Sequence, residues 1–185
     1  MRVLGIDPGI ARTGVAVVDG TPGRLTLVDA RCLEPIPQTS ESGRLAHLLQ
    51  LVTELIARLA PDVASVEQLF FATNKRTAMR VSEARGVVLC ALGARGLEVS
   101  EYTPMQVKEA VCGYGGARKP QVARMAAKLL GVPSVPGPDD VSDACAVAIC
   151  HHHRARLGTL VGGQGVRSAA LDAAVARALL AQAPR

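Results

Sequence analysis

Four carboxylates stand at positions where acidic side chains are unexpected. Asp7 ends one apolar segment, and Glu67 ends a second one, Val63–Val66. Asp140 and Asp143 are three residues apart, a spacing that puts both on one face of a helix. Because carboxylates are rarely buried unless they are paired or bind metal, the four positions together indicate a metal site.

A set of carboxylate ligands suits Mg²⁺, which prefers octahedral coordination by oxygen. Two such ions, roughly 3.5–4 Å apart, can hold both the attacking water and the leaving oxygen of a phosphodiester. No side-chain nucleophile is then required. A Ser-His-Asp or Cys-His site has no support beyond the presence of those residue types. The pattern therefore predicts metal-dependent hydrolysis of a phosphodiester.

Each carboxylate also has an ordinary explanation when it is considered alone. Asp7 can form a turn at a strand end, Glu67 can be a solvated strand end, and Asp139 and Asp140 can cap a helix. Asp139 lies four residues before Asp143, so it competes with Asp140 for the same role. The residues alone leave this choice open.

The elements that position these carboxylates begin with strands. Residues 2–7, 14–19 and 24–34 predict an antiparallel meander, because apolar and β-branched residues alternate around a Gly-containing turn. Residues 62–67 and 97–102 predict two more strands. In the first turn, Gly9 and Gly14 are expected to let the backbone pass close to Asp7, with Arg12 and Thr13 lining the site.

Helices are predicted between and after the later strands. Apolar residues recur at helical spacing from Leu45 to Leu59, with Ser42 as the candidate N-cap and Pro61 as the stop. Thr103 and Pro104 are typical of an N-cap and first residue. The remaining helices are expected at residues 76–94, 120–130 and 139–156. The order predicts an α/β fold with a mixed five-stranded sheet flanked by helices.

The length and composition indicate one principal domain. Residues 1–157 are expected to form it, and residues 158–185 to form a Gly-rich linker and a helical tail. The longest apolar runs fall far short of the roughly 20 residues of a membrane span, and no signal peptide is visible. A cytoplasmic chain is therefore expected. Its five cysteines form no CxxC pair and are interpreted as reduced core residues.

Positive charge is concentrated in the middle of the chain. Between Lys75 and Lys128 there are ten basic and four acidic residues, a net charge of +6, against +5 for the whole chain. Such a basic segment suits a polyanion such as nucleic acid.

Five segments, in order over roughly residues 1–157, resemble the RuvC family of Holliday-junction resolvases. No single motif carries the resemblance, but five segments at matching spacing are specific. They are GIDPGIARTGVAVV (5–18), VEQLFFATN (66–74), ARGVVL (84–89), YTPMQVKEAVCGYGGARKPQV (102–122) and DDVSDACAVAICH (139–151).

The resemblance implies a ribonuclease-H-like fold and a homodimer that nicks two strands of a four-way DNA junction symmetrically. It implies 5′-phosphate and 3′-hydroxyl ends, two Mg²⁺ ions per site with Mn²⁺ as a substitute, and the RuvA–RuvB branch-migration complex as partner. Carried over by motif, the four acids are Asp7, Glu67, Asp140 and Asp143. Some relatives have histidine at the third position, so the ligand type there tolerates change.

Further residues are candidates for contacts with DNA. Phe70 and Phe71 are the only phenylalanines and follow the Glu67 strand, which suggests stacking on unpaired bases; a core or loop anchor is the alternative. Phe71 replaces a smaller residue common in the family. Lys108 and Lys119 match family lysines near the scissile phosphate. Backbone contacts are assigned to Asn74, Arg76 and Arg118.

Three other interpretations compete with a junction resolvase. An actin-like or ribonuclease-H-like ATPase needs a second domain that 185 residues do not supply. A non-catalytic junction-binding module would not need all four acids. A shorter RuvX/YqgF-type nuclease lacks the segments at Glu67 and Thr103. His151–His153 resembles a metal cluster, but consecutive helical residues point about 100° apart, so a structural role is expected.

Overall fold

The computed structural model describes residues 1–21, 23–36, 40–68 and 75–160, without the side chains of 75–77 and 156–160. The elements follow the predicted order of three strands, then alternating helices and strands, then three helices. They are β1 (Arg2–Asp7), β2 (Thr13–Thr21), β3 (Arg24–Leu33), α1 (Glu41–Leu59), β4 (Val63–Glu67), α2 (Lys75–Ala94), β5 (Glu98–Tyr102), α3 (Pro104–Cys112), α4 (Lys119–Leu130) and α5 (Asp139–Leu160).

The five strands form one mixed sheet in the order β3-β2-β1-β4-β5. β1 pairs antiparallel with β2, and β2 with β3, as the meander predicts. β1 and β4 are parallel, and so are β4 and β5. The carboxyl ends of these three parallel strands therefore meet at one edge of the sheet.

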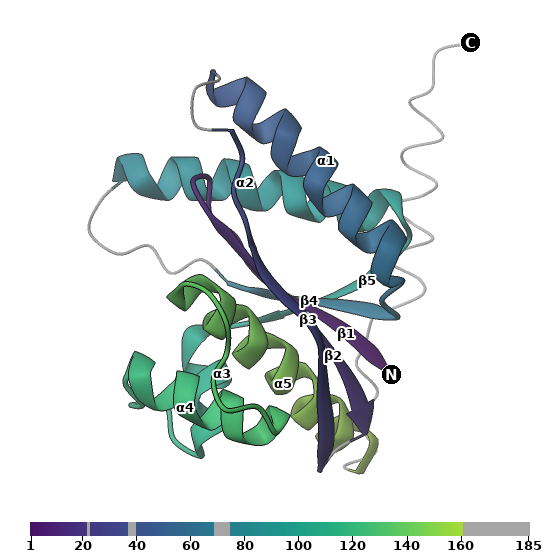
Figure 1. Ribbon diagram of the computed structural model, residues 1–185, viewed down its shortest axis with the longest axis vertical. Helices are drawn as coiled ribbons and strands as arrows, with labels where there is room; N and C mark the ends of the chain where they lie inside the picture. The colour runs from purple at the N-terminus through teal and green to yellow at the C-terminus, as the bar shows by residue number, and fades with distance from the viewer. Residues whose placement is uncertain (22, 37–39, 69–74, 161–185) are drawn as a thin grey trace. The chain divides into compact units, whose positions relative to one another are not determined.

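Helices cover both faces of the sheet (Figure 1). α1 and α2 lie on one face, and α3, α4 and α5 lie on the other. Each face has its own core. One core gathers Leu4, Ile6 and the apolar sides of α1 and α2, whereas the other surrounds α5, whose residues 144–150 are all buried. Residues Met1–Arg154 form one compact unit, which contains all five strands.

The alternation of side chains along β1 decides which face its carboxylate takes. Leu4 and Ile6 pack in the core of α1 and α2, and Val3 packs in the core of α5. Because successive side chains in a strand point to opposite faces, Asp7 lies on the α5 face with Val3. In β4, Val63 lies in the α5 core, which places Glu67 on that same face.

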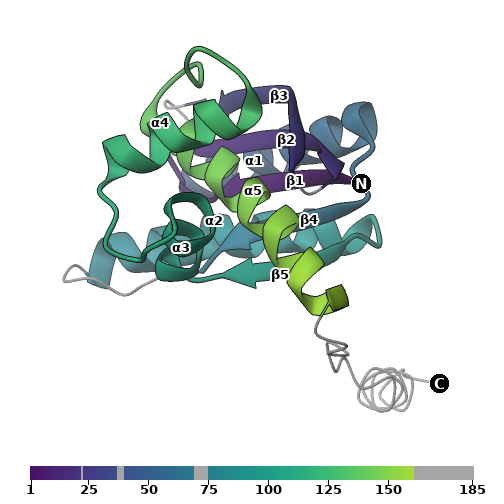
Figure 2. The same cartoon turned by 90° about the horizontal axis from the view of Figure 1, so that it is seen from below.

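α5 lies across this face of the sheet (Figure 2) and approaches it closely. A Cβ atom on Gly5 would collide with the carbonyl oxygen of Ala144, so no larger residue fits there. In the adjacent strand, the Ser65 hydroxyl donates a hydrogen bond of 3.3 Å to the carbonyl of Val147. Small residues in β1 and β4 thus admit the helix and bring its first turn to the end of the sheet.

The structure corrects two predicted boundaries. The N-cap of α1 is Ser40 rather than Ser42, because the Ser40 hydroxyl accepts a 3.1 Å hydrogen bond from the Gly43 amide. α5 continues to Leu160, beyond the predicted end at residue 156, so residues 158–160 are helical rather than linker. One glycine within a helix costs only about 1 kcal/mol, which neighbouring turns can offset. The rest of the predicted tail, residues 161–185, lies outside the described residues.

Two composition-based predictions can also be compared with the structure. No helix within the described ranges is long and apolar enough to cross a membrane. All five cysteines are free; Cys145 and Cys150 are buried as predicted, whereas Cys90 is exposed on α2. The core interpretation was therefore wrong for Cys90, because its aliphatic neighbours along the chain point to other sides of the helix.

Candidate active site

A cavity of about 320 Å³ opens where β1 and β4 end. Asp7, Glu67 and Asp143 line it, so three of the four predicted acids face one space. The wall opposite them comes from α3 and α4 and includes both predicted lysines. The other lining residues are Pro104, Val107, Lys108, Lys119 and Val122.

Strand pairing places Asp7 and Glu67 side by side. Ile6 pairs with Val66 in the parallel ladder between β1 and β4, so the two carboxylates follow at equivalent positions. Asp143 reaches the same space from the first turns of α5, because that helix rests on the small residues of the sheet described above. Three segments distant in sequence thus converge on one cavity.

The electrostatics of this cavity favour a cation. Burial, followed by the charges of Glu67, Asp143 and Asp140, raises the pKa of Asp7 to about 8. Burial and then Asp143 raise the pKa of Glu67 to about 7, although Lys119 and Lys108 oppose the shift. The two lysines therefore do not compensate the buried carboxylates fully, and additional positive charge would stabilise their ionised forms.

Lys119 is the cation most closely engaged with the acids. Its Nζ donates a 2.8 Å hydrogen bond to Asp143 Oδ2, and this bond is the main cause of the raised pKa of Lys119. The lysine begins α4, directly after a Gly-rich loop and before Pro120. Lys108 lines the same cavity from α3. The structure thus brings both predicted lysines to the acids.

Asp140 lies beside the cavity rather than in its lining. Its negative charge contributes to the raised pKa of Asp7, so the two side chains are near each other. Arg12 Nε lies 3.1 Å from Asp140 Oδ2, but that oxygen is buried and accepts no hydrogen bond, since the two groups are not aligned for one. The neighbouring Asp139 is exposed. Asp140 is consequently better placed than Asp139 to act with Asp7.

The carboxylate oxygens of this site suit a hard divalent cation, although they are not arranged in a preformed metal site. Among the described residues, no three Asp, Glu, His or Cys side chains are grouped tightly enough to hold an ion as they stand. Two features nevertheless fit a metal: the incompletely compensated carboxylates of Asp7 and Glu67, and the buried Asp140 oxygen without a hydrogen bond. Oxygen ligands of this kind match Mg²⁺ or Mn²⁺.

Several predicted DNA contacts cannot be placed. Phe70, Phe71 and Asn74 lie outside the described residues, and so does the side chain of Arg76 at the start of α2. Arg118 is described and lies at the N-cap of α4, where its backbone amide donates a 2.8 Å hydrogen bond to Gln121 Oε1.

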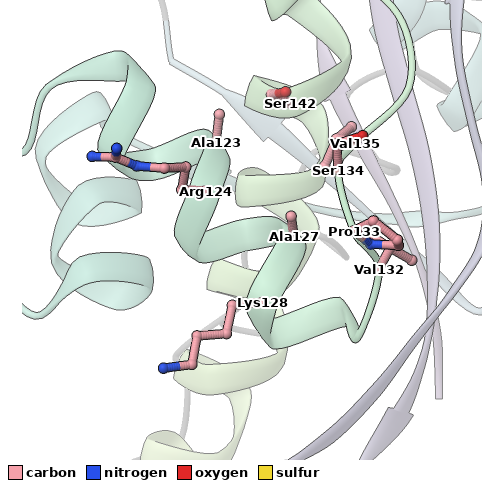
Figure 3. A pocket seen from close by; sticks show the side chains of 9 residues that line it. All are labelled: Ala123, Arg124, Ala127, Lys128, Val132, Pro133, Ser134, Val135 and Ser142. Atoms are coloured by element: carbon pink, nitrogen blue, oxygen red, sulfur yellow. The ribbon is translucent and has the colours of Figure 1, made fainter.

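Arg118 lines a second cavity, of about 520 Å³, together with Tyr114 and Arg124. A third cavity, of about 420 Å³, follows along α4 between that helix and the connector to α5. Figure 3 shows Arg124 and Lys128 projecting from α4 on the side away from Pro133. Neither cation forms an ion pair with a carboxylate of the described residues. The surface beside the acids is therefore basic and available to a polyanion.

The three consecutive histidines have separate structural partners, as predicted. His151 Nδ1 is 3.0 Å from the Tyr102 hydroxyl in β5. His152 Nε2 is 3.0 Å from the carbonyl of Val18 in β2, and His153 Nδ1 is 2.9 Å from the carbonyl of Ala110 in α3. They fasten α5 to three different elements rather than to one ion.

Sequence reasoning missed two contributors to this site. Arg12 was expected only to line it, whereas it pairs with Asp140. Gly5 was not singled out, yet it is one of the positions at which α5 touches the sheet. A signal for Gly5 exists in the sequence, because a glycine between Leu4 and Ile6 in a buried strand often marks a close approach of another backbone.

Comparisons with known proteins find a matching family and a similar fold. Residues 3–151 match the family model described as crossover junction endodeoxyribonuclease RuvC. Proteins of that name from Pelotomaculum thermopropionicum and Chloroflexus aggregans are 46% and 48% identical, over 83% and 84% of this chain and 93% and 94% of theirs. The structure of Thermus thermophilus RuvC in complex with Holliday junction substrate is similar, with a TM-score of 0.81 and 37% identity over 86% of this chain and 97% of that one.

Proposed function

Since this chain belongs to the RuvC family of crossover junction endodeoxyribonucleases, we propose that it cleaves four-way DNA junctions with Asp7, Glu67, Asp140 and Asp143 as metal ligands. Family membership makes it an endonuclease that acts on Holliday junctions and depends on metal. The observation that carries the residue assignment is the cavity at the ends of β1 and β4, which unites carboxylates from three distant segments.

We propose Mg²⁺ as the physiological metal, with two ions per site and Mn²⁺ as a substitute. When bound, such ions activate a water molecule and neutralise charge on the phosphate. The carboxylates would hold the metal ions, Asp7, Glu67 and Asp143 from the lining of the cavity and Asp140 from beside it. Lys119 and Lys108, on the opposite wall, are placed to neutralise the phosphate of the strand to be cut.

The remaining contacts with the junction are assigned to the basic surface around the cavity. Arg118, Arg76 and Asn74 are proposed to hold the DNA backbone, and Phe70 and Phe71 to stack on bases at the crossover. Attack by water on the phosphate leaves a 5′-phosphate and a 3′-hydroxyl, ends that can be rejoined. We place this reaction in recombination and DNA repair in the cytoplasm.

The proposed assembly is a homodimer, because a junction has two strands to be nicked symmetrically. The outer side of α2 is a candidate interface: Met79 is 66% exposed, and Gly86 and Cys90 are exposed about two and three turns further along the same side. Apart from its chain neighbours and the backbone of its own helix, no atom of the described residues lies within 4 Å of a Cβ built on Gly86. The RuvA–RuvB complex is proposed as the partner that delivers the junction, on the basis of family membership alone.

Cleavage of a synthetic four-way junction tests the activity and its residues. The protein should nick the junction with Mg²⁺ or Mn²⁺ and should bind it uncut when metal is chelated. Asp7→Asn and Asp143→Asn should each bind without detectable cleavage. Asp19→Asn is the matched control, because Asp19 lies at the opposite end of the β1–β2 pair, where it bonds to Arg2. Cleavage by either site variant at the rate of this control would rule out the assignment.

The dimer is tested separately by sedimentation. Gly86→Glu should shift the population toward monomer, because a carboxylate would be placed between the two copies. Its open surroundings mean that the variant can still fold. Ala46→Glu, at an exposed position on α1, should leave the dimer intact. An unchanged sedimentation coefficient for the Gly86 variant would exclude α2 as the interface.

A further inference from the structure

The ion pair between Arg12 and Asp140 has no part in the hydrolysis described above. It joins the turn after β1 to the first turn of α5, with 3.1 Å between Arg12 Nε and Asp140 Oδ2. The arginine side chain is 53% exposed, whereas the carboxylate oxygen it faces is buried. One partner can thus leave for solvent readily, and the other cannot.

The turn that carries Arg12 is closed by its own hydrogen bonds. The Thr13 hydroxyl donates to the Gly9 carbonyl at 2.7 Å and accepts from the Gly9 amide at 3.3 Å. Thr13 is fully buried. A Cβ on Gly9 would collide with the carbonyl of Arg12, so the turn is also tightly wound. The backbone of Arg12 therefore has little freedom, and only its side chain can move.

The same turn rests directly on α5. A Cβ on Gly14 would collide with the carbonyl oxygen of Asp140, which shows that the two backbones are in contact there. This contact fixes the distance from the Arg12 backbone to the Asp140 carboxylate. The backbone contact consequently keeps the Arg12 guanidinium within reach of the Asp140 carboxylate.

The two cations beside the acids are held differently. Lys119 makes an aligned 2.8 Å hydrogen bond to Asp143, whereas Arg12 approaches Asp140 without such alignment. Both cations are partly exposed, Lys119 at 67% and Arg12 at 53%, so alignment is what distinguishes the two pairs. The unaligned pair is the weaker one and is lost first when another cation competes for the carboxylate. The Asp140 oxygen therefore has a cationic neighbour but accepts no hydrogen bond from it.

We propose that Arg12 is the built-in counter-ion of the metal-free site, which occupies Asp140 until a divalent cation displaces it. The inference rests on the proposed function, in which Asp140 is a metal ligand. Arg12 is thus a positioning residue that holds the carboxylate in its place beside the cavity before metal arrives. It also weakens metal binding, because the metal must take the place of the guanidinium.

Linkage gives this arrangement a measurable signature. An interaction present only in the metal-free protein lowers metal affinity by the same factor by which it stabilises that state. Arg12→Ala should therefore destabilise the metal-free protein and strengthen metal binding. For an ion pair with an exposed partner, the expected increase in affinity is about 1.5- to fivefold.

Calorimetric titration of the full chain with Mn²⁺, without DNA, measures this effect. Arg58→Ala is the matched control, because Arg58 is 52% exposed and its Nη2 also lies 3.1 Å from a carboxylate oxygen, that of Asp29. Arg12→Ala should bind Mn²⁺ more tightly than this control and should melt at a lower temperature in chelator. Saturating Mn²⁺ should remove the difference in melting temperature. Arg12→Lys, which keeps the charge, should bind close to wild type.

The outcomes separate this inference from the proposed function. Equal or weaker Mn²⁺ binding by Arg12→Ala, relative to Arg58→Ala, overturns the counter-ion role. A lysine variant that binds like the alanine variant also overturns it, since charge would not be the cause. Asp140→Asn should lose affinity in the same titration. If it binds Mn²⁺ like wild type, the ligand set of the proposed function is wrong.

Discussion

Asp7 illustrates how a functional carboxylate opposes the stability of the protein that carries it. Its ordinary pKa of 3.8 rises to about 8 because burial and three neighbouring carboxylates disfavour its charge. Between about pH 4 and pH 8, Asp7 therefore keeps its proton in the folded, metal-free chain, whereas it releases that proton in the unfolded chain. Stability from this group is greatest at low pH and is lost as the pH rises from about 4 to about 8.

Asp7→Asn should accordingly make the metal-free protein less sensitive to alkaline pH. Asparagine does not titrate, so the variant should melt above wild type at pH 8 by about 2–4 °C for each kcal/mol regained, with a smaller difference at pH 5.5. Thermal unfolding in chelator at both pH values provides the measurement.

Asp19→Asn is the control of opposite sign. Its hydrogen bond with Arg2 lowers the pKa of Asp19, so that stabilisation is already complete at pH 5.5 and should be lost equally at both pH values. If Asp7→Asn and wild type instead lose melting temperature in parallel between pH 5.5 and 8, the raised pKa of Asp7 is contradicted.

At the scale of elements, the site depends on how closely α5 approaches the sheet. Gly14→Ala should destabilise the protein by about 1–3 kcal/mol and abolish cleavage, because the added methyl group meets the Asp140 carbonyl and displaces the first turn of the helix. Chemical denaturation and junction cleavage measure the two effects.

Gly86→Ala should have the opposite effect on stability. Gly86 lies within α2 with open space around its Cβ position, so alanine should stabilise the protein by about 0.5–1 kcal/mol through helix propensity. If Gly14→Ala leaves the free energy of unfolding unchanged while Gly86→Ala raises it, the close contact between β2 and α5 is not needed for stability.

Local patterns in the sequence predicted most elements because each depends on neighbouring residues. Thr103 and Pro104 predict the start of α3, and the structure confirms both as N-cap and first residue, with Gln106 completing a capping box. Ser42 failed as the N-cap of α1 because Ser40, two residues earlier, satisfies the same rule. Among adjacent residues with equal capping ability, the packing of the helix decides, and the sequence does not display it.

The grouping of the candidate acids could be predicted from the sequence, but their contacts with other residues could not. The acids were found from their unusual positions in apolar segments, and Asp7, Glu67 and Asp143 do share a cavity. The pairing of Arg12 with Asp140 depends on contact between segments far apart in the chain. Neither residue carries a local sign of the other, so only the folded backbone reveals it.

For the whole molecule, the charge distribution extends the site beyond its cavity. Arg124 and Lys128 lie on one side of α4, one helical turn apart (Figure 3). Arg124 also lines a cavity together with Arg118, so the basic surface includes all three residues. A DNA backbone that enters the cavity can run along this helix. Each phosphate contact adds about one to the slope of binding against salt concentration.

Arg124→Ala and Lys128→Ala should each weaken junction binding and lower that slope by about one. The effect should be the same for junctions of different sequence, because phosphates carry no base information. Binding titrations over a range of salt concentrations provide the slope. Arg24→Ala is the control: Arg24 begins β3, paired with the far end of β2 from Gly14. Slopes that match this control would exclude α4 from the DNA path.

The alternation of side chains along β1 has a consequence for how this chain can vary. Deleting one residue between Val3 and Asp7 would turn the Asp7 carboxylate to the face covered by α1 and α2. The other acids of the site lie on the opposite face. Exchanging Leu4 or Ile6 for another aliphatic residue would leave the carboxylate where it is. Conservative exchanges at Leu4 and Ile6 are therefore compatible with the site, whereas a change in the length of this strand is not.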